Sequence, residues 1–461
     1  MTKQMHLSVD LSFTHADGKW RVPGSWVGAD YPDLGLYKEI AMIVERGCFD
    51  MIFWGDGTGI PDTWQGSLEE GVRWGVQWPR LDMTPFIAVM AQETKHVGFT
   101  LTYSSTFMHP FYVARLLNSL DHVTHGRIAL NVVATTRLSD FGNYGVEMDD
   151  HDGRYDRMEE FIDVAKALWN SVEPDAIVRN RETGEFADPT KIHAINHVGK
   201  HFKVRGPLNV IPSPQLHPVL INAGASPRGV RASARFADVI FGTGGQLPMI
   251  RERRKQLDDM LIDEGRDPAY VGVQAAVPVT VGRTRAEAEA KRAVYSQALP
   301  FEAVGAYISH NLGFDFSVLP ETFIFGEIAE RIVKAQASQA GLLFEMMRER
   351  GADAECTRQE FFEFCYKSIN GGSSGAIVGT PAEVADVLEE RFEAMGERGG
   401  FMFTGATPVP GAIADIVNLL VPELQRRGRA RTKYEGNTLR ENLGVPPVNT
   451  NQRRREMATV A

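Results

Sequence analysis

Residues 97–110 are VGFTLTYSSTFMHP, and this stretch, with its continuation to Ala134, decides the fold. A β-rich run ends at His109-Pro110, because proline cannot continue a strand ladder. An apolar stripe at helical spacing follows, made of Val113, Leu116, Leu117 and Leu120. Residues 128–133 (IALNVV) are almost continuously apolar, which is typical of a parallel strand buried on both faces. The order predicts a βαβ unit with Thr102 and Asn131 near the carboxyl ends of its strands, the edge where α/β proteins bind ligands.

The composition indicates a globular protein with a large core. The chain has 461 residues, 43% of them apolar, which is enough for one large domain. No apolar run is long enough to span a membrane, and the first residues lack the apolar core of a signal peptide. A formal charge of −10 disfavours nucleic acid and anionic membranes as partners. The three cysteines (Cys48, Cys356 and Cys365) have no metal-type spacing, so we expect no metal site and a cytoplasmic location.

Eight strand signals alternate with helical patterns along the chain. The strands are expected at 5–12, 49–54, 97–104, 127–134, 218–223, 238–241, 271–281 and 401–403. Helices are expected between them, at 36–46, 157–169, 228–236, 248–264 and 381–395. The alternation predicts an α/β fold, a (β/α)8 TIM barrel with insertions. The alternative, a doubly wound sheet, would need a glycine-rich phosphate turn after the first strand, and none is visible.

We expect a single domain over residues 1–461. A helical insertion and a short tail do not follow the alternation of strands and helices that is typical of a barrel. The insertion at 284–375 falls between strands seven and eight and carries aromatic residues such as Tyr307 and Phe316. It is either an active-site lid over the carboxyl edge or an oligomer interface. Residues 446–461 are expected to form a flexible tail.

Two loops carry residues with more than one interpretation. The polar segment 180–214 has His193, His197 and His201 four residues apart, which on a helix would suggest a metal site. Gly199 argues against a helix there, so we expect surface histidines. Three tryptophans follow the second strand and either line a substrate pocket, which we favour, or anchor the loop; they are Trp64, Trp74 and Trp78.

Seven motifs in order resemble those of the bacterial-luciferase-like flavin monooxygenases, and more narrowly the nitrilotriacetate, EDTA and dibenzothiophene-sulfone monooxygenase subfamily. They are FDMIFWGD (49–56), SSTFMHPF (104–111), GR with NVV (126–133), HDGRYDR (151–157), AGASPRG (223–229), VPELQRRG (421–428) and YEGNTLR (434–440). The resemblance extends over roughly residues 5–445. One departure is Ala134-Thr135-Thr136, where the subfamily has Thr-Ser after Asn-Val-Val.

The resemblance implies six residues that bind FMN: Asp56, Thr102, Asn131, His151, Tyr155 and Ser226. Asp56 corresponds to a carboxylate near the flavin ring system, and Thr102 to a strand residue that faces the ring. His151 and Tyr155 correspond to a pair that approaches the ribityl chain and the phosphate. Thr102 and Asn131 are also the implied catalytic residues, on either side of the dioxygen site.

Two of these assignments have support from the residues alone. Asn131 stands among apolar strand residues, where an amide must find partners or cost stability. Ser226 lies in a glycine-containing turn before a helix, where backbone N–H groups suit a phosphate. Without the resemblance, Asp56 would first be interpreted as a loop or helix-capping residue, and 151–155 as a solvated loop before a helix. Thr102 could be an ordinary β-branched strand residue.

The resemblance further implies an FMNH2-dependent monooxygenase of a two-component system. A separate NAD(P)H:flavin reductase would supply reduced FMN, O2 would be the co-substrate, and a small organic molecule would receive one oxygen atom. A homodimer or homotetramer is expected. Two alternatives stay open: a deazaflavin-dependent hydride-transferring oxidoreductase and, less favoured, a non-catalytic flavin-binding protein. The sequence does not identify the substrate, and no cluster of arginines that would mark a polyanionic chelate is evident along it.

Overall fold

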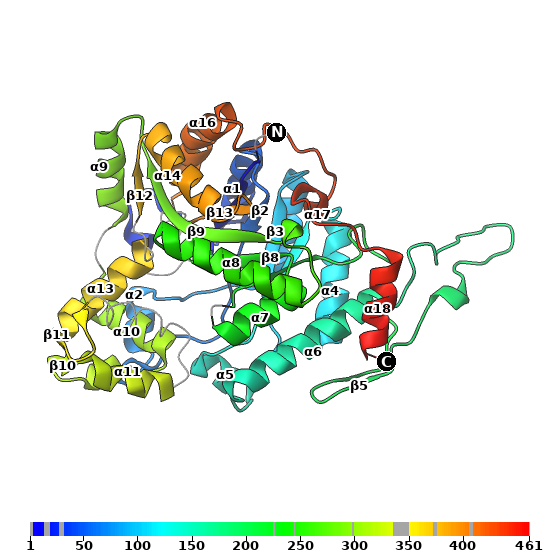
Figure 1. The fold of residues 1–461 in the computed structure, drawn as a ribbon, viewed down its shortest axis with the longest axis horizontal. Helices are drawn as coiled ribbons and strands as arrows, with labels where there is room; N and C mark the ends of the chain where they lie inside the picture. The colour runs from blue at the N-terminus through cyan, green and yellow to red at the C-terminus, as the bar shows by residue number, and fades with distance from the viewer. Residues whose placement is uncertain are drawn as a thin grey trace.

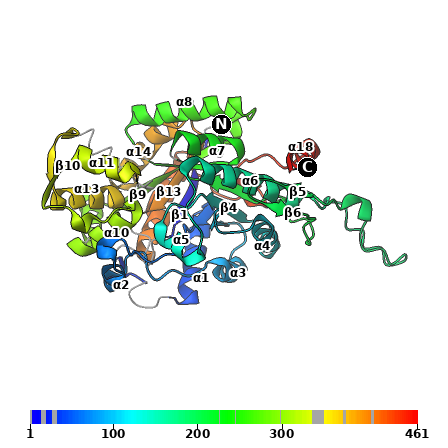
Figure 2. The same cartoon turned by 90° about the horizontal axis from the view of Figure 1, so that it is seen from below.

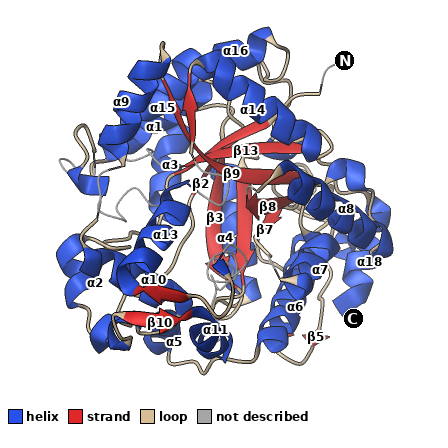
Figure 3. Cartoon of the chain, turned by 60° about the vertical axis from the view of Figure 1, so that its left-hand side comes forward, coloured by secondary structure: helices blue, strands red, loops and turns tan. Residues whose placement is uncertain are grey.

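A closed barrel of eight parallel strands forms the centre of the computed structural model (Figure 3). The structure describes residues 3–12, 19–26, 32–224, 226–243, 245–296, 299–334, 350–371, 376–404 and 409–460. The barrel strands are β1 (His6–Asp10), β2 (Met51–Phe53), β3 (Gly98–Ser104), β4 (Ile128–Val133), β7 (Val219–Asn222), β8 (Val239–Thr243), β9 (Gly272–Val281) and β13 (Gly399–Thr404). Pairing of β9 with both β8 and β13, and of β13 with β1, closes the ring. The predicted (β/α)8 barrel is therefore confirmed.

Helices surround the barrel, in the alternation that the sequence predicts (Figure 1). They are α1 (Leu34–Arg46), α2 (Glu69–Trp74), α3 (Thr84–Glu93), α4 (Pro110–Val123), α5 (Leu138–Tyr144), α6 (His151–Asn170), α7 (Pro227–Phe236), α8 (Leu247–Asp263), α14 (Pro381–Ala394), α15 (Pro410–Asp415), α16 (Val421–Arg426) and α17 (Leu439–Asn442). Helix α4 begins at Pro110, as predicted, and the ring of His109 accepts a hydrogen bond from the N–H of Phe111. None of the helices in the described part of the chain combines the length and the apolar character needed to span a bilayer.

The predicted insertion lies between β9 and β13 and has its own apolar core. It contains α9 (Arg285–Tyr295), α10 (Phe301–Leu312), β10 (Thr322–Ile324), α11 (Phe325–Lys334), β11 (Glu355–Thr357) and α13 (Arg358–Gly371). Strands β10 and β11 pair antiparallel, and β12 (Ile377–Gly379) then returns the chain to the end of β9. Phe316 and Phe361 are fully buried in this core, with ring centroids 5.0 Å apart. The insertion is thus a packed unit beside the barrel.

The segment between α6 and β7 extends away from the barrel (Figures 1 and 2). It carries a short antiparallel hairpin, β5 (His197–Val198) and β6 (Lys203–Val204). His193 lies 2.7 Å from a carboxylate oxygen of Glu173, and His197 lies 3.0 Å from one of Glu160. None of the three histidines lies on a helix, as predicted, but the expectation of surface histidines is wrong for His197, which lies in β5 with a side chain only 10% exposed.

The carboxyl terminus differs from the flexible tail that we expected. Residues 450–460 form helix α18 (Thr450–Val460), which packs against α6. The side-chain amide of Asn170 donates to Glu456 at 2.7 Å, and Val460 is buried. Tertiary contacts order a segment whose own sequence is mostly polar.

Two of the sequence motifs hold the barrel together and do not reach the carboxyl edge. Arg127, at the start of β4, is 1% exposed and donates to backbone carbonyls, including those of Thr124 and Val97. Tyr434 donates its hydroxyl to the carbonyl of Phe49 at 2.6 Å. These residues brace the amino ends of β2, β3 and β4, so the groups available for chemistry lie at the opposite edge.

Candidate active site

The strand register brings Thr102 and Asn131 directly opposite each other. They are paired positions of β3 and β4, near the carboxyl ends of both strands. The Asn131 amide nitrogen donates to the Thr102 hydroxyl at 2.9 Å, and that hydroxyl donates to the Trp54 carbonyl at 2.7 Å. Both side chains are buried. Among the described residues, the side-chain oxygen of Asn131 has no hydrogen-bond partner.

This hydrogen-bonded chain leaves one buried acceptor without a partner among the described residues. The proton of the Thr102 hydroxyl is used by Trp54, so the hydroxyl faces Asn131 as an acceptor. The amide of Asn131 is held with its nitrogen toward Thr102, and its oxygen is the atom left over. A buried, unpaired amide oxygen costs stability unless a ligand satisfies it.

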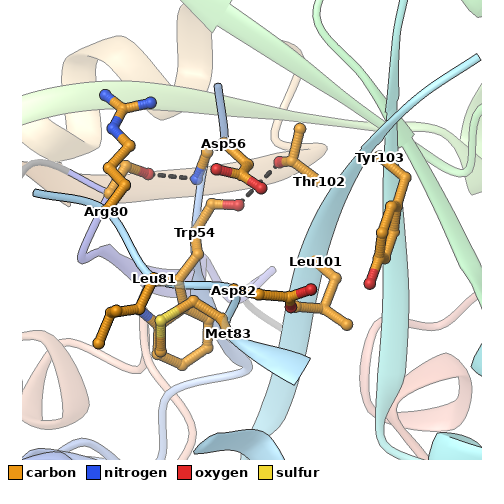
Figure 4. A pocket seen from close by; sticks show the side chains of 11 residues that line it. Trp54, Asp56, Arg80, Leu81, Asp82, Met83, Leu101, Thr102 and Tyr103 are labelled. Atoms are coloured by element: carbon orange, nitrogen blue, oxygen red, sulfur yellow. Dashed lines mark hydrogen bonds between the residues drawn. The ribbon is translucent and has the colours of Figure 1, made fainter. Parts of the chain in front are cut away.

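A pocket opens next to this pair, between the loops that follow β1 and β2 (Figure 4). Ser12, Trp54, Asp56, Arg80 and Thr102 are among the residues that line it. Ser12 joins the ends of two strands, because its hydroxyl hydrogen bonds with the carboxylate of Asp10 and with the N–H of Gly55. Burial raises the pKa of Asp10 to about 6, although its hydrogen bonds with Ser12 oppose the shift.

Asp56 is one of the residues that line this pocket. Its side chain is exposed and accepts a hydrogen bond from the N–H of Gly57 at 2.7 Å. Desolvation by surrounding atoms raises its pKa, while the charge of Arg80 opposes that shift. The carboxylate is thus available to a ligand above β2.

The other predicted residues form a second polar cluster where α6 meets α7. His151 and Tyr155 lie in the first turns of α6, and Ser226 is the N-cap of α7. The His151 Nε2 atom is 3.2 Å from the Ser226 hydroxyl, and the ring centroids of His151 and Tyr155 are 5.2 Å apart. A Cβ atom on Gly229 would lie 2.5 Å from the Tyr155 hydroxyl oxygen, so a glycine is needed for this approach.

The chemistry of this second cluster fits a phosphate. The N-terminus of α7, a helix of ten residues, offers a positive dipole end. A serine hydroxyl, a tyrosine hydroxyl and an imidazole stand beside it, and each can donate a hydrogen bond. The donors of this cluster are therefore of the kind that bind a phosphate group.

Sequence reasoning did not find Asn222 at the end of β7. Its amide nitrogen donates to the Val132 carbonyl at 2.7 Å, and its oxygen accepts from the Ser233 hydroxyl at 2.6 Å. The signal was the same as for Asn131, an amide in an apolar strand. Because both ends of the Asn222 amide are paired, this residue joins β4, β7 and α7 structurally.

The insertion reaches this edge of the barrel through α10. His310 on α10 is 3% exposed, and its Nε2 atom has no hydrogen-bond partner among the described residues. Burial, together with the charges of Arg137 and Arg80, lowers its pKa to about 3, so the imidazole is neutral. A neutral histidine of the insertion therefore lies near two arginines of the barrel loops.

Trp64 anchors its loop to the insertion. It is buried, and its ring centroid lies 5.7 Å from that of Phe362 and 6.2 Å from that of Phe301. Trp78, by contrast, is 37% exposed. Our preference for a pocket lined by the three tryptophans is therefore wrong for Trp64, whose contacts are those of a structural anchor.

No group of three or more potential metal-ligating side chains occurs among the residues that the structure describes. The polar groups at the carboxyl edge are amide, hydroxyl, imidazole and guanidinium groups with a few carboxylates. Such a set suits an organic ligand with a phosphate.

Comparison with known proteins first gives the class. Residues 20–398 match the family described as luciferase-like monooxygenase, and the chain belongs to this family. It is therefore a monooxygenase, an oxidoreductase of the flavoprotein type, on a TIM barrel.

Individual relatives then narrow the comparison. The chain is 34% identical to dibenzothiophene-sulfone monooxygenase of Rhodococcus erythropolis (strain XP), over 96% of this chain and 97% of that protein. It is 35% identical to nitrilotriacetate monooxygenase component A of Aminobacter aminovorans, over 96% and 97%. The crystal structure of a riboflavin lyase with modified FMN and riboflavin matches with a TM-score of 0.88 at 29% identity, over the full length of both chains.

Proposed function

We propose that this chain is the oxygenase component of a two-component system. It binds reduced FMN made by a separate NAD(P)H:flavin reductase and inserts one oxygen atom of O2 into a small organic substrate. The observation that carries this proposal is the buried, unpaired side-chain oxygen of Asn131 at the carboxyl edge of the barrel.

The Asn131 oxygen favours the reduced form of the flavin. A reduced isoalloxazine ring carries an N–H donor at a nitrogen that is only an acceptor in the oxidised ring. The Asn131 oxygen, an acceptor that Thr102 fixes in place, would accept a hydrogen bond from the N–H of the reduced ring. It would face a second acceptor in the oxidised ring, which is unfavourable. Thr102 is then a positioning residue, because its own proton is held by Trp54 and it acts by orienting Asn131.

His151, Tyr155 and Ser226 would hold the phosphate of FMN at the start of α7. Asp56 would lie near the ring system. Bound FMN supplies the redox chemistry and the activation of dioxygen. The insertion would exclude water from the carboxyl edge, since α10 brings the buried His310 next to the loops that follow β2 and β4.

A binding experiment tests the proposal directly. FMN affinity is measured by anaerobic titration of the reduced form and by fluorescence titration of the oxidised form, for the wild type and for Asn131→Leu. We expect the wild type to prefer reduced FMN, and the preference to fall by about fivefold in the variant, the effect of one neutral hydrogen bond of about 1 kcal/mol. Tighter binding of oxidised FMN by the wild type would contradict the proposal.

A second experiment, on catalysis, distinguishes a monooxygenase from a deazaflavin-dependent hydride-transferring oxidoreductase. Oxygen uptake is followed with reduced FMN from an added reductase, and the reaction is repeated with a reduced deazaflavin without oxygen. We expect oxygen uptake only in the first case, and no NADH oxidation by the protein alone. Rapid NADH oxidation without a reductase would refute the two-component assignment.

A further inference from the structure

Two arginines meet at one point beside the pocket, although the sequence gives no sign of it. Gly57 directly follows Asp56, and a Cβ atom on Gly57 would lie 2.0 Å from Nη1 of Arg137 and 3.2 Å from Nη1 of Arg80. Arg137 is the residue before α5, and Arg80 lies in the loop before α3. Two guanidinium groups this close repel each other. The carboxylates of Asp10 and Asp56 interact with the charge of Arg80, so Arg137 is the group that an added anion would stabilise.

Two carboxylates in this region hold the backbone of the loop. Asp140 accepts hydrogen bonds from the N–H groups of Thr58 at 2.8 Å and Gly59 at 2.5 Å. Asp56 accepts one from the N–H of Gly57 at 2.7 Å. None of the ion pairs among the described residues includes Arg137. The positive charge of Arg137 is therefore not matched by a direct carboxylate contact in this part of the chain.

The insertion contributes a neutral polar side chain near the two arginines, that of His310 on α10. His310 is 3% exposed, and its Nε2 atom has no hydrogen-bond partner among the described residues. The charges of Arg137 and Arg80 act on it, which places it within electrostatic range of both. A buried imidazole near two cations can donate a hydrogen bond to an anion without adding a third charge.

We infer that Gly57, Arg80 and Arg137 form a subsite for an anionic group of the substrate, a carboxylate or a sulfonate. This inference rests on the proposed function, because Arg80 lines the same pocket as Asp56 and Thr102 and the anion would sit beside the flavin. Guanidinium groups bind planar, two-oxygen anions with paired hydrogen bonds, which suits either acid. Gly57 leaves the space in which the two side chains meet.

The test uses small probes, because the substrate itself is not identified. Succinate and methanesulfonate are titrated into the full-length protein saturated with FMN, and their neutral counterparts succinamide and dimethyl sulfone are titrated in parallel. Binding is followed by isothermal calorimetry and by the fluorescence of Trp54, which lines the pocket. We expect the anions to bind at least about tenfold more tightly than the neutral probes, as for charge-assisted hydrogen bonds.

Three variants locate the effect. Arg137→Met should abolish the preference for anions, and Gly57→Ala should reduce it, since the added methyl group occupies the position of the Arg137 guanidinium. Gly142→Ala is the matched control on α5, where a Cβ atom would meet nothing within 4 Å, and it should keep the full preference. Melting temperatures show that each variant is folded, and Gly57→Ala tests the site with its charges intact.

The outcomes separate this inference from the proposed function. If the wild type binds reduced FMN and takes up oxygen but shows equal affinity for charged and neutral probes, the subsite is wrong and the monooxygenase stands. If Arg137→Met weakens FMN binding while riboflavin binding is kept, the arginines hold the FMN phosphate and the inference is overturned. If the wild type does not bind reduced FMN, the proposed function fails, whatever the probes show.

Discussion

Replacing Thr102 with valine keeps the shape of the side chain and removes the hydroxyl on which two buried hydrogen bonds depend. The Asn131 amide nitrogen would lose its acceptor, and the Trp54 carbonyl would lose its donor. A buried polar group left without a partner costs about 1–3 kcal/mol, so the two together should lower the free energy of unfolding by about 2–6 kcal/mol. Strand propensity does not offset this loss, because both residues are β-branched.

Matched variants on the same strand isolate the hydrogen bonds from packing. Thr100 is fully buried two residues earlier in β3, and among the described residues its hydroxyl donates to the sulfur of Met51, at 3.2 Å. Because sulfur is a weak acceptor, Thr100→Val should cost less than about 1 kcal/mol. Thr102→Ser keeps the hydroxyl and should retain most of the hydrogen-bond energy.

The assay is urea unfolding of the three variants, followed by far-UV circular dichroism, with the midpoint and slope of each transition compared. The same proteins are then titrated with reduced and oxidised FMN. We expect Thr102→Val alone to lose the preference for the reduced form, because Asn131 is no longer held in one orientation. If Thr102→Val were as stable as Thr100→Val and kept the preference for reduced FMN, the argument for a fixed Asn131 acceptor would be refuted.

Three further predictions concern the phosphate cluster, the carboxyl-terminal helix and the insertion. Ser226→Ala and Tyr155→Phe should each weaken FMN binding by about 1–3 kcal/mol and leave riboflavin binding nearly unchanged; equal losses for both ligands would place these residues elsewhere. His217, just before β7, lies 3.6 Å from a carboxylate oxygen of Glu456 in the carboxyl-terminal helix α18. Burial lowers the pKa of His217 from 6.5 to about 4, so the folded state binds fewer protons than the unfolded state between these values. Stability should then fall by about 2 kcal/mol from pH 8 to pH 5 through this group, and denaturant titrations of His217→Gln should show a shallower loss; an unchanged slope would contradict the assignment. Trp64→Ala should loosen the insertion, seen as faster hydrogen exchange of residues 301–312 and more hydrogen peroxide released per oxygen consumed, and unchanged exchange there would show that Trp64 is not the anchor.

The arrangement of strands was predictable because it depends on local pattern. Buried parallel strands such as 128–133 are continuous apolar runs, and proline at position 110 fixes where a strand gives way to a helix. The pair of Thr102 and Asn131 could be proposed because both are polar residues near the ends of neighbouring strands. Their hydrogen bond also required the register of β3 and β4, which the sequence does not state.

Other features depended on contacts between distant segments. The tail was expected to be flexible because its own composition is polar, yet α18 gains order from Asn170 and the rest of α6. Tryptophan is a residue type that often lines pockets, which is why Trp64 was expected there. Its burial in the core of the insertion depends on contacts with helices more than two hundred residues later in the chain.

The sequence by itself determined the alternation of strands and helices, the barrel and the residue types at its carboxyl edge. These features depend on hydrophobic periodicity and turn residues, which can be recognised within short segments of the chain. Only the tertiary structure decided which of those residues share a hydrogen bond or a charge. Arg80 and Arg137 stand in separate loops with no common motif, and the sequence showed no arginine cluster. They meet at Gly57 because closing the barrel brings the loops after β2 and β4 to one edge, a consequence of long-range strand pairing that no local pattern contains.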